Sequence, residues 1–171
     1  MFSADSATLA LASHEWTVQL SDGKMGDHIV TLHGHFGGGC IAFSADGSRL
    51  ILGSFNIGVM DVIPYTFDKA VLIWDITDTT RPRLLFKGTG VDVSYARACN
   101  SVFLLETRRE PTLCGLTVLN LDSPSTKHTI CWFPTNVSPR HLVVHPAGLT
   151  AAVLCDDGHL LFLDLSKVPI S

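Results

Sequence analysis

The chain has 171 residues, of which 46% are apolar and 16% charged, and its formal net charge is −4 at pH 7. This composition is typical of a folded globular protein and excludes an intrinsically disordered one. The Lys and Arg residues are scattered, which argues against nucleic-acid and anionic-membrane partners because both need a concentrated positive field.

A turn signal, an apolar run and a strand ending in Asp recur along the chain. The copies close at Asp22, Asp75, Asp122 and Asp164, and the third copy is the weakest. A recurrence at intervals of about 40 to 50 residues indicates a repeat architecture. We therefore expect one segment built of four units, approximately 1–32, 33–88, 89–134 and 135–171.

Each unit is predicted to form short β-strands, because β-branched and turn residues dominate and no helical spacing of apolar residues is sustained. The predicted fold class is all-β. In the second unit we expect strands at 40–43, 49–53, 70–76 and 83–87. The apolar runs at 71–74 and 160–163 do not alternate with polar residues, a pattern that predicts strands covered on both faces.

The second unit resembles a WD repeat of the β-propeller family. The resemblance is carried by Gly34-His35, Phe43-Ser-Ala-Asp-Gly47, Leu50-Ile-Leu-Gly-Ser54 and Asp68-Lys-Ala-Val-Leu-Ile-Trp74-Asp75. The first and fourth units match less fully, and the third keeps only the pattern of its third strand. The resemblance implies blades of four antiparallel strands that close into a ring.

The same resemblance implies a hydrogen-bonded network within the second blade. Its members are His35, Ser54, Asp68 and Trp74. Such a network supports the fold, since each buried bond contributes about 1 kcal/mol. Asp68 is therefore a poor candidate for catalysis.

The register of the units predicts an incomplete ring. The chain opens inside the first strand of one unit and stops after the third strand of the fourth, which makes about three and a half blades. Propellers use typically four to eight. We expect the remainder of a ring in cis or in trans, with a closed four-bladed ring as the alternative.

No catalytic or metal-binding constellation is predicted. The Gly triplet after Phe36 resembles the oxyanion loop of esterases, but the Gly-x-Ser-x-Gly nucleophile motif is absent. His28, His33 and His35 lack the closing pair of a zinc site. Asp156 and Asp157 occupy a predicted tight turn, where Asp and Gly are favoured, and Asp61 is the other acid weighed for acid/base work. We expect no catalytic residue, cofactor or metal.

The segment 55–67 is long and unusually apolar for a loop. One interpretation has it fold back over its own blade; the other has it present aromatic anchors to a partner, as interface hot spots do. By register, further candidates lie on the same rim. The predicted partner-binding residues are Trp16, Phe36, Met60, Ile63, Tyr65, Phe67, Arg108 and Arg109.

The five cysteines are widely spaced, with no C-x-x-C pair, and are interpreted as buried thiols in a reducing compartment, the cytoplasm or nucleus. The favoured function is a non-catalytic scaffold that binds a protein or peptide through rim loops. One alternative is a propeller-borne enzyme or small-molecule binder that uses the ring centre. The other is a purely structural module of a larger multidomain signalling protein.

Overall fold

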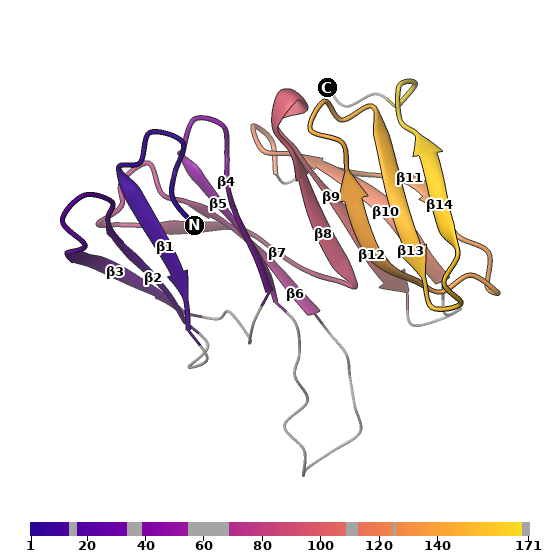
Figure 1. Ribbon diagram of the computed structural model, residues 1–171, viewed down its shortest axis with the longest axis horizontal. Helices are drawn as coiled ribbons and strands as arrows, with labels where there is room; N and C mark the ends of the chain where they lie inside the picture. The colour runs from indigo at the N-terminus through magenta and orange to yellow at the C-terminus, as the bar shows by residue number, and fades with distance from the viewer. Residues whose placement is uncertain (14–16, 34–38, 55–68, 109–112, 125, 169–171) are drawn as a thin grey trace, which may run out of the picture. The chain divides into compact units, whose positions relative to one another are not determined.

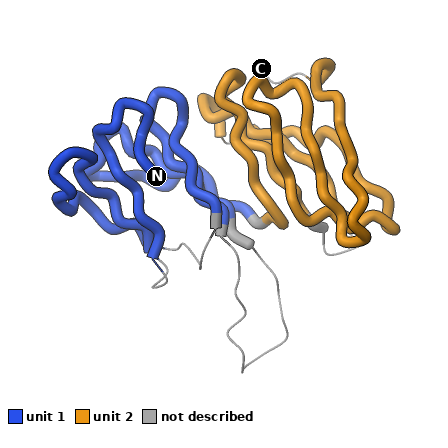
Figure 2. The backbone as a smooth tube through the Cα atoms, viewed as in Figure 1, with its two compact units in different colours: residues 1–88 blue, residues 89–171 orange. Residues whose placement is uncertain are grey.

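The computed structural model describes residues 1–13, 17–33, 39–54, 69–108, 113–124 and 126–168. The chain divides into two compact units, Met1–Gly88 and Thr89–Ser171, which Figure 2 shows in different colours. This division does not test the predicted division into four sequence units, which stays a prediction. From here on, the first unit is Met1–Gly88 and the second unit is Thr89–Ser171. Among the described residues no helix is long and apolar enough to cross a membrane.

The first unit contains two meandering sheets (Figure 1). The three-stranded sheet has the order β1-β2-β3, and the four-stranded sheet has the order β4-β5-β6-β7. The strands are β1 (Thr8–Ala12), β2 (Thr17–Asp22), β3 (His28–His33), β4 (Gly39–Phe43), β5 (Arg49–Ser54), β6 (Lys69–Asp75) and β7 (Arg83–Gly90). The four strands predicted for the second sheet are confirmed to within a few residues at their ends.

The second unit repeats this arrangement with a four-stranded sheet, β8-β9-β10-β11, and a three-stranded sheet, β12-β13-β14. A short 3-10 helix (Arg97–Cys99) joins the first two strands. The strands are β8 (Asp92–Ala96), β9 (Ser101–Arg108), β10 (Leu113–Asn120), β11 (Lys127–Trp132), β12 (Pro139–Val144), β13 (Thr150–Cys155) and β14 (Leu160–Asp164). The predicted all-β class with separate antiparallel sheets is confirmed.

Three of the sheets place their closing Asp at the same point of the ladder. Asp22, Asp75 and Asp164 each pair with the first residue of the preceding strand, which is Thr8, Arg49 and Thr150 respectively. In the remaining sheet the Asp lies beyond β10, where Asp122 accepts a 3.0 Å hydrogen bond from the Asn100 side chain. The copy that is weakest in sequence is thus also the one whose register differs.

The turn that precedes β1, β5, β9 and β13 also recurs. It contains one residue with positive φ in each copy, a conformation that glycine adopts most readily. These residues are Ser6 (60°), Gly47 (75°), Asn100 (45°) and Gly148 (74°). The first sheet has only a remnant of its first strand, a bridge between Phe2 and Leu9.

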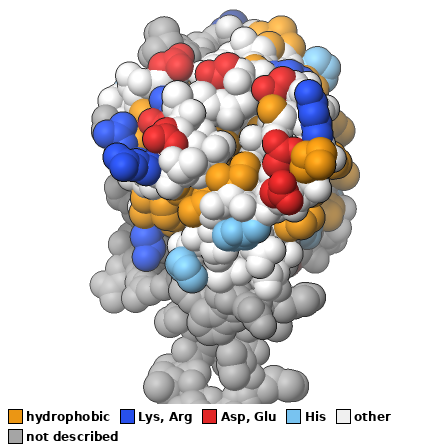
Figure 3. Space-filling view, turned by 90° about the vertical axis from the view of Figure 1, so that its left-hand side faces the viewer, with side chains coloured by type: hydrophobic (Ala, Val, Ile, Leu, Met, Phe, Trp, Pro, Cys, Tyr) orange, Lys and Arg blue, Asp and Glu red, His pale blue; other side chains and the backbone are white. Residues whose placement is uncertain are grey.

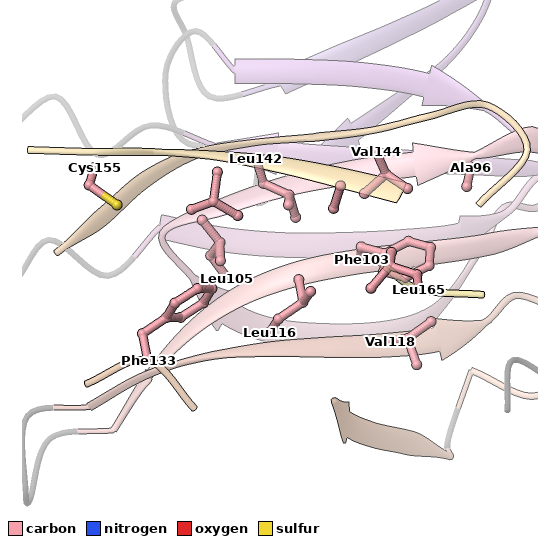
Figure 4. Close-up of a cluster of buried hydrophobic side chains, with 12 residues drawn as sticks. Ala96, Phe103, Leu105, Leu116, Val118, Phe133, Leu142, Val144, Cys155 and Leu165 are labelled. Atoms are coloured by element: carbon pink, nitrogen blue, oxygen red, sulfur yellow. The ribbon is translucent and has the colours of Figure 1, made fainter. Parts of the chain in front are cut away.

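Each unit has a core between the facing sides of its two sheets. In the first, Leu20, Leu50 and Leu72 belong to one buried cluster. In the second, Phe103 and Leu116 of one sheet and Leu142 and Val144 of the other belong to one buried cluster (Figure 4). Stacked apolar sheet faces of this kind supply most of the stabilisation of a β-blade pair.

The consecutive apolar runs have different environments. Val71, Leu72 and Ile73 are all buried, so the prediction that this strand is covered on both faces is confirmed. The prediction is wrong for the run at 160–163, because Leu160 is 53% and Phe162 79% exposed. Only one face of that sheet packs against a neighbouring sheet of its own unit.

Candidate functional site

Trp74 is the one member of the predicted network whose side chain the structure describes. It pairs with Leu50 on the neighbouring strand and packs, half-buried, against the core of the first unit. Its indole Nε1 is buried and has no hydrogen-bond partner among the described residues. Ser54 ends β5 four residues beyond Leu50, about 13 Å along an extended strand, so the backbone places it far along the ladder from Trp74. The side chains of His35, Ser54 and Asp68 lie outside the described residues, and the network stays a prediction.

The predicted partner-binding residues also lie outside the described residues. This holds for Trp16, Phe36, Met60, Ile63, Tyr65, Phe67 and Arg109. Arg108 ends β9, where its backbone pairs with Leu113, and its side chain is not described. The rim surface therefore also stays a prediction.

The Asp75 carboxylate, at the end of β6, is held by hydrogen bonds from neighbouring residues. Asp75 accepts hydrogen bonds from the Thr77 hydroxyl at 2.7 Å and from the Arg49 guanidinium at 2.9 Å. The Thr77 hydroxyl, more than the charges of Arg49 and Arg83, lowers the pKa of Asp75. A carboxylate held in this way stays ionised and acts as an acceptor that closes its turn.

Asp156 and Asp157 have the same character. Asp156 pairs with the Arg140 guanidinium, and Asp157 accepts hydrogen bonds from the backbone and the ring of His159, the latter at 2.8 Å. These contacts lower the pKa of both carboxyls, and the Asp157 carboxylate raises the pKa of His159. The pKa of neither acid is raised toward neutral pH, as that of a general acid would be.

The histidines weighed as metal ligands do not converge with other ligands in the described part of the chain. His28 contacts the Thr31 hydroxyl at 2.9 Å, His33 ends β3, and His35 is not described. No group of three or more His, Cys, Asp or Glu side chains within the described ranges could hold a metal ion.

Four cysteines belong to the core of the second unit. Cys155 is buried there, and Cys99, Cys114 and Cys131, which are partly buried, pack against it. Burial, followed by the neighbouring thiols of Cys131 and Cys155, raises the pKa of Cys114 to about 11. The prediction of buried cysteines is wrong for Cys40, which is exposed because strand alternation places it opposite the core-facing Ile41 and Phe43.

An apolar surface that the sequence did not predict lies on the sheet β12-β13-β14. Its most exposed residues are Val143 (66%), Leu154 (37%), Leu160 (53%) and Phe162 (79%), and we call this surface the open face. Ladder pairing joins Val143 to Phe162 through Ala152, and joins Leu154 to Leu160 directly. The sequence signal was the unbroken apolar run 160–163, which indicated burial but not what would supply it.

A different face of the molecule shows another pattern. In Figure 3, side chains of both charge signs are interspersed with small apolar patches over the described part of that face. No field of one sign gathers there.

The comparisons with known proteins agree with the fold. No protein-family model matches the chain, and no curated protein does. Among solved structures, a chain of the mitotic checkpoint complex matches with a TM-score of 0.65 and 15% identity, covering 95% of this chain and 47% of that one. The Cps50 (Swd1) β-propeller domain of Myceliophteria thermophila matches with a TM-score of 0.64 and 10% identity, covering 95% of this chain and 51% of that one. The chain thus has the fold of β-propeller blades and spans about half the length of each of these two chains.

Proposed function

We propose that the chain is a non-catalytic protein-interaction module of the WD-repeat β-propeller type. The observation that carries the proposal is the repetition of one sheet-and-turn unit, matched over 95% of the chain by propeller structures. One of those propellers was solved within a complex, the mitotic checkpoint complex. Repeats of this kind offer their turns and loops to partners while the strands maintain the fold.

The proposed partners are a protein or peptide bound through the rim loops, and the remainder of a propeller ring in cis or in trans. The rim site would consist of the apolar segment 55–67 with the other predicted partner-binding residues. The proposal includes no cofactor, nucleic acid or membrane, and places the protein in the cytoplasm or nucleus.

The test compares three forms of the 171-residue chain in quantitative affinity purification. One is unaltered, one carries Tyr65→Ser and Phe67→Ser, and the control carries Met25→Ser. Met25 is 78% exposed on a described turn outside the proposed rim site, so its change removes an exposed apolar side chain elsewhere on the chain. We expect the double variant to recover at least tenfold less of each specific partner than the unaltered chain, and the control to recover the same amount. Equal retention by all three forms would refute rim-loop binding.

A further inference from the structure

The outer edge of β14 pairs with no other strand among the described residues. Cys155 N–H bonds to the His159 carbonyl and Leu165 N–H to the Leu149 carbonyl, which fixes the alternation of the β13–β14 ladder. By that alternation Leu161 and Leu163 direct their backbone groups toward β13. Leu160, Phe162 and Asp164 direct theirs away from it. Among the described residues no strand follows β14 in its sheet.

The same edge residues carry exposed apolar side chains. Leu160 is 53% and Phe162 79% exposed, whereas Leu161 and Leu163 pack against the core of the second unit. An exposed apolar strand at a sheet edge is a template for pairing with another chain. Asp164 supplies the one charge on this strand.

The internal repeat indicates what kind of element covers such an edge. In the two four-stranded sheets, β7 lies beside β6 and β11 lies beside β10, each in the place where no described strand lies beside β14. The β10–β11 pair is antiparallel. A fourth strand therefore fits the edge of β14 by the geometry of this chain's own sheets.

We propose that this strand is the β14 of a second copy of the chain, paired antiparallel with Phe162 opposite Phe162. Phe162 is the central residue of strand Leu160–Asp164, so a two-fold axis at this residue lets the strand pair with its own copy. In this register every outward backbone group of Leu160, Phe162 and Asp164 gains a partner. Asp164 lies opposite Leu160 of the second copy, so the two carboxylates do not face each other. The β12-β13-β14 sheets of the two copies then form one continuous sheet.

The test measures the mass of the full chain by analytical ultracentrifugation at 1 to 100 µM, together with site-resolved amide exchange. We expect a dimer at the upper concentrations, with the amides of residues 160, 162 and 164 protected only there. The amides of residues 161 and 163 should be protected at every concentration. A chain that stays monomeric throughout, or dimerises without protecting residue 162, would overturn the proposal.

Three lysine substitutions separate edge pairing from stacking of the open face. Phe162→Lys places two like charges opposite each other and should weaken the dimer at least tenfold. Leu160→Lys places each new lysine opposite Asp164 of the other copy and should leave the dimer at least as tight. Val143→Lys is the matched control, an equally polar change on the same face but on β12, and should have no effect. Equal weakening by all three would indicate face stacking instead and overturn the edge pairing. This outcome is independent of the rim-loop test, because none of these residues lies in the rim site.

Discussion

Ser6 and Gly47 occupy the same position in two equivalent turns, with φ of 60° and 75°. Each donates its backbone N–H at 3.0 Å to the carbonyl of the serine three residues earlier, Ser3 or Ser44. The serine hydroxyls in turn contact Asp5 and Asp46, each at 2.6 Å. The two turns are therefore the same structure built with a strained residue in one copy and an unstrained one in the other.

Replacing Ser6 with glycine should raise the free energy of unfolding by up to about 1 kcal/mol, since a left-handed conformation costs about that much for a residue with a Cβ. Gly47→Ala should lower it by about 1 kcal/mol, because a new Cβ would meet only Ser3 at 3.8 Å and the backbone conformation alone is penalised. Urea unfolding of each variant measures both changes. A destabilised Ser6→Gly protein would contradict the equivalence of the turns.

Gly148→Ala should cost more than Gly47→Ala. Here a new Cβ would lie 2.6 Å from the Cys99 sulfur, so a steric clash adds to the conformational cost of a φ of 74°. We expect a loss of about 2 kcal/mol or more in urea unfolding. In a Cys99→Ala background, Gly148→Ala should cost less free energy of unfolding than in the unaltered chain, because the clash with the Cys99 sulfur is gone and only the conformational cost remains. An equal cost in both backgrounds would mean that the Cys99 contact is unimportant.

Trp74 should stabilise the first unit through packing. Trp74→Ala is expected to lower the free energy of unfolding by about 3 kcal/mol, whereas Trp74→Phe should cost under about 1 kcal/mol because Nε1 has no acceptor among the described residues. Ser21→Ala, at the matching position of the first sheet, serves as the comparison. A loss of about 1 to 3 kcal/mol for Trp74→Phe would instead indicate that Nε1 has a hydrogen-bond acceptor, as the predicted network requires.

Asp46 should make stability depend on acid pH. Hydrogen bonds from the hydroxyls of Ser44 and Ser48 lower its pKa from 3.8 to about 2. The ionised form is thus favoured by folding, so its contribution is complete above pH 3.8 and is lost as the pH falls through 2. Because the side chain is largely exposed, we expect this contribution to be about 1 kcal/mol. Chemical unfolding at pH 7, 3.5 and 2 should show it in the unaltered chain, and a similar slope in Asp46→Asn would exclude this assignment.

The cysteines should differ in their reactivity toward thiol reagents. At pH 8 a thiol with a pKa of about 11, like that of Cys114, is ionised in only about one molecule in a thousand, and burial also raises the pKa of Cys131 and Cys155. Cys40 is exposed, so we expect it to be alkylated first in the native protein. Peptide mass spectrometry after timed alkylation measures the order, with denatured protein as the control. Modification of Cys114 before Cys40 would mean that the second unit opens readily.

The sequence by itself determined the all-β class, the four strands of the second sheet and the repetition, because these depend on local features: the apolar run Val71–Ile73, the turn at 45–47 and the Asp at or just beyond the end of each third strand. Local reasoning also placed the weakest copy where the ladder register differs, at Asn100 and Asp122. Only the tertiary structure decided which apolar residues are covered. Leu72 and Phe162 both lie in unbroken apolar runs of the sequence. Leu72 is buried against a second sheet, whereas Phe162 faces solvent on a strand that ends its sheet among the described residues. Burial depends on which sheet lies opposite, a relation between distant residues that no local pattern specifies.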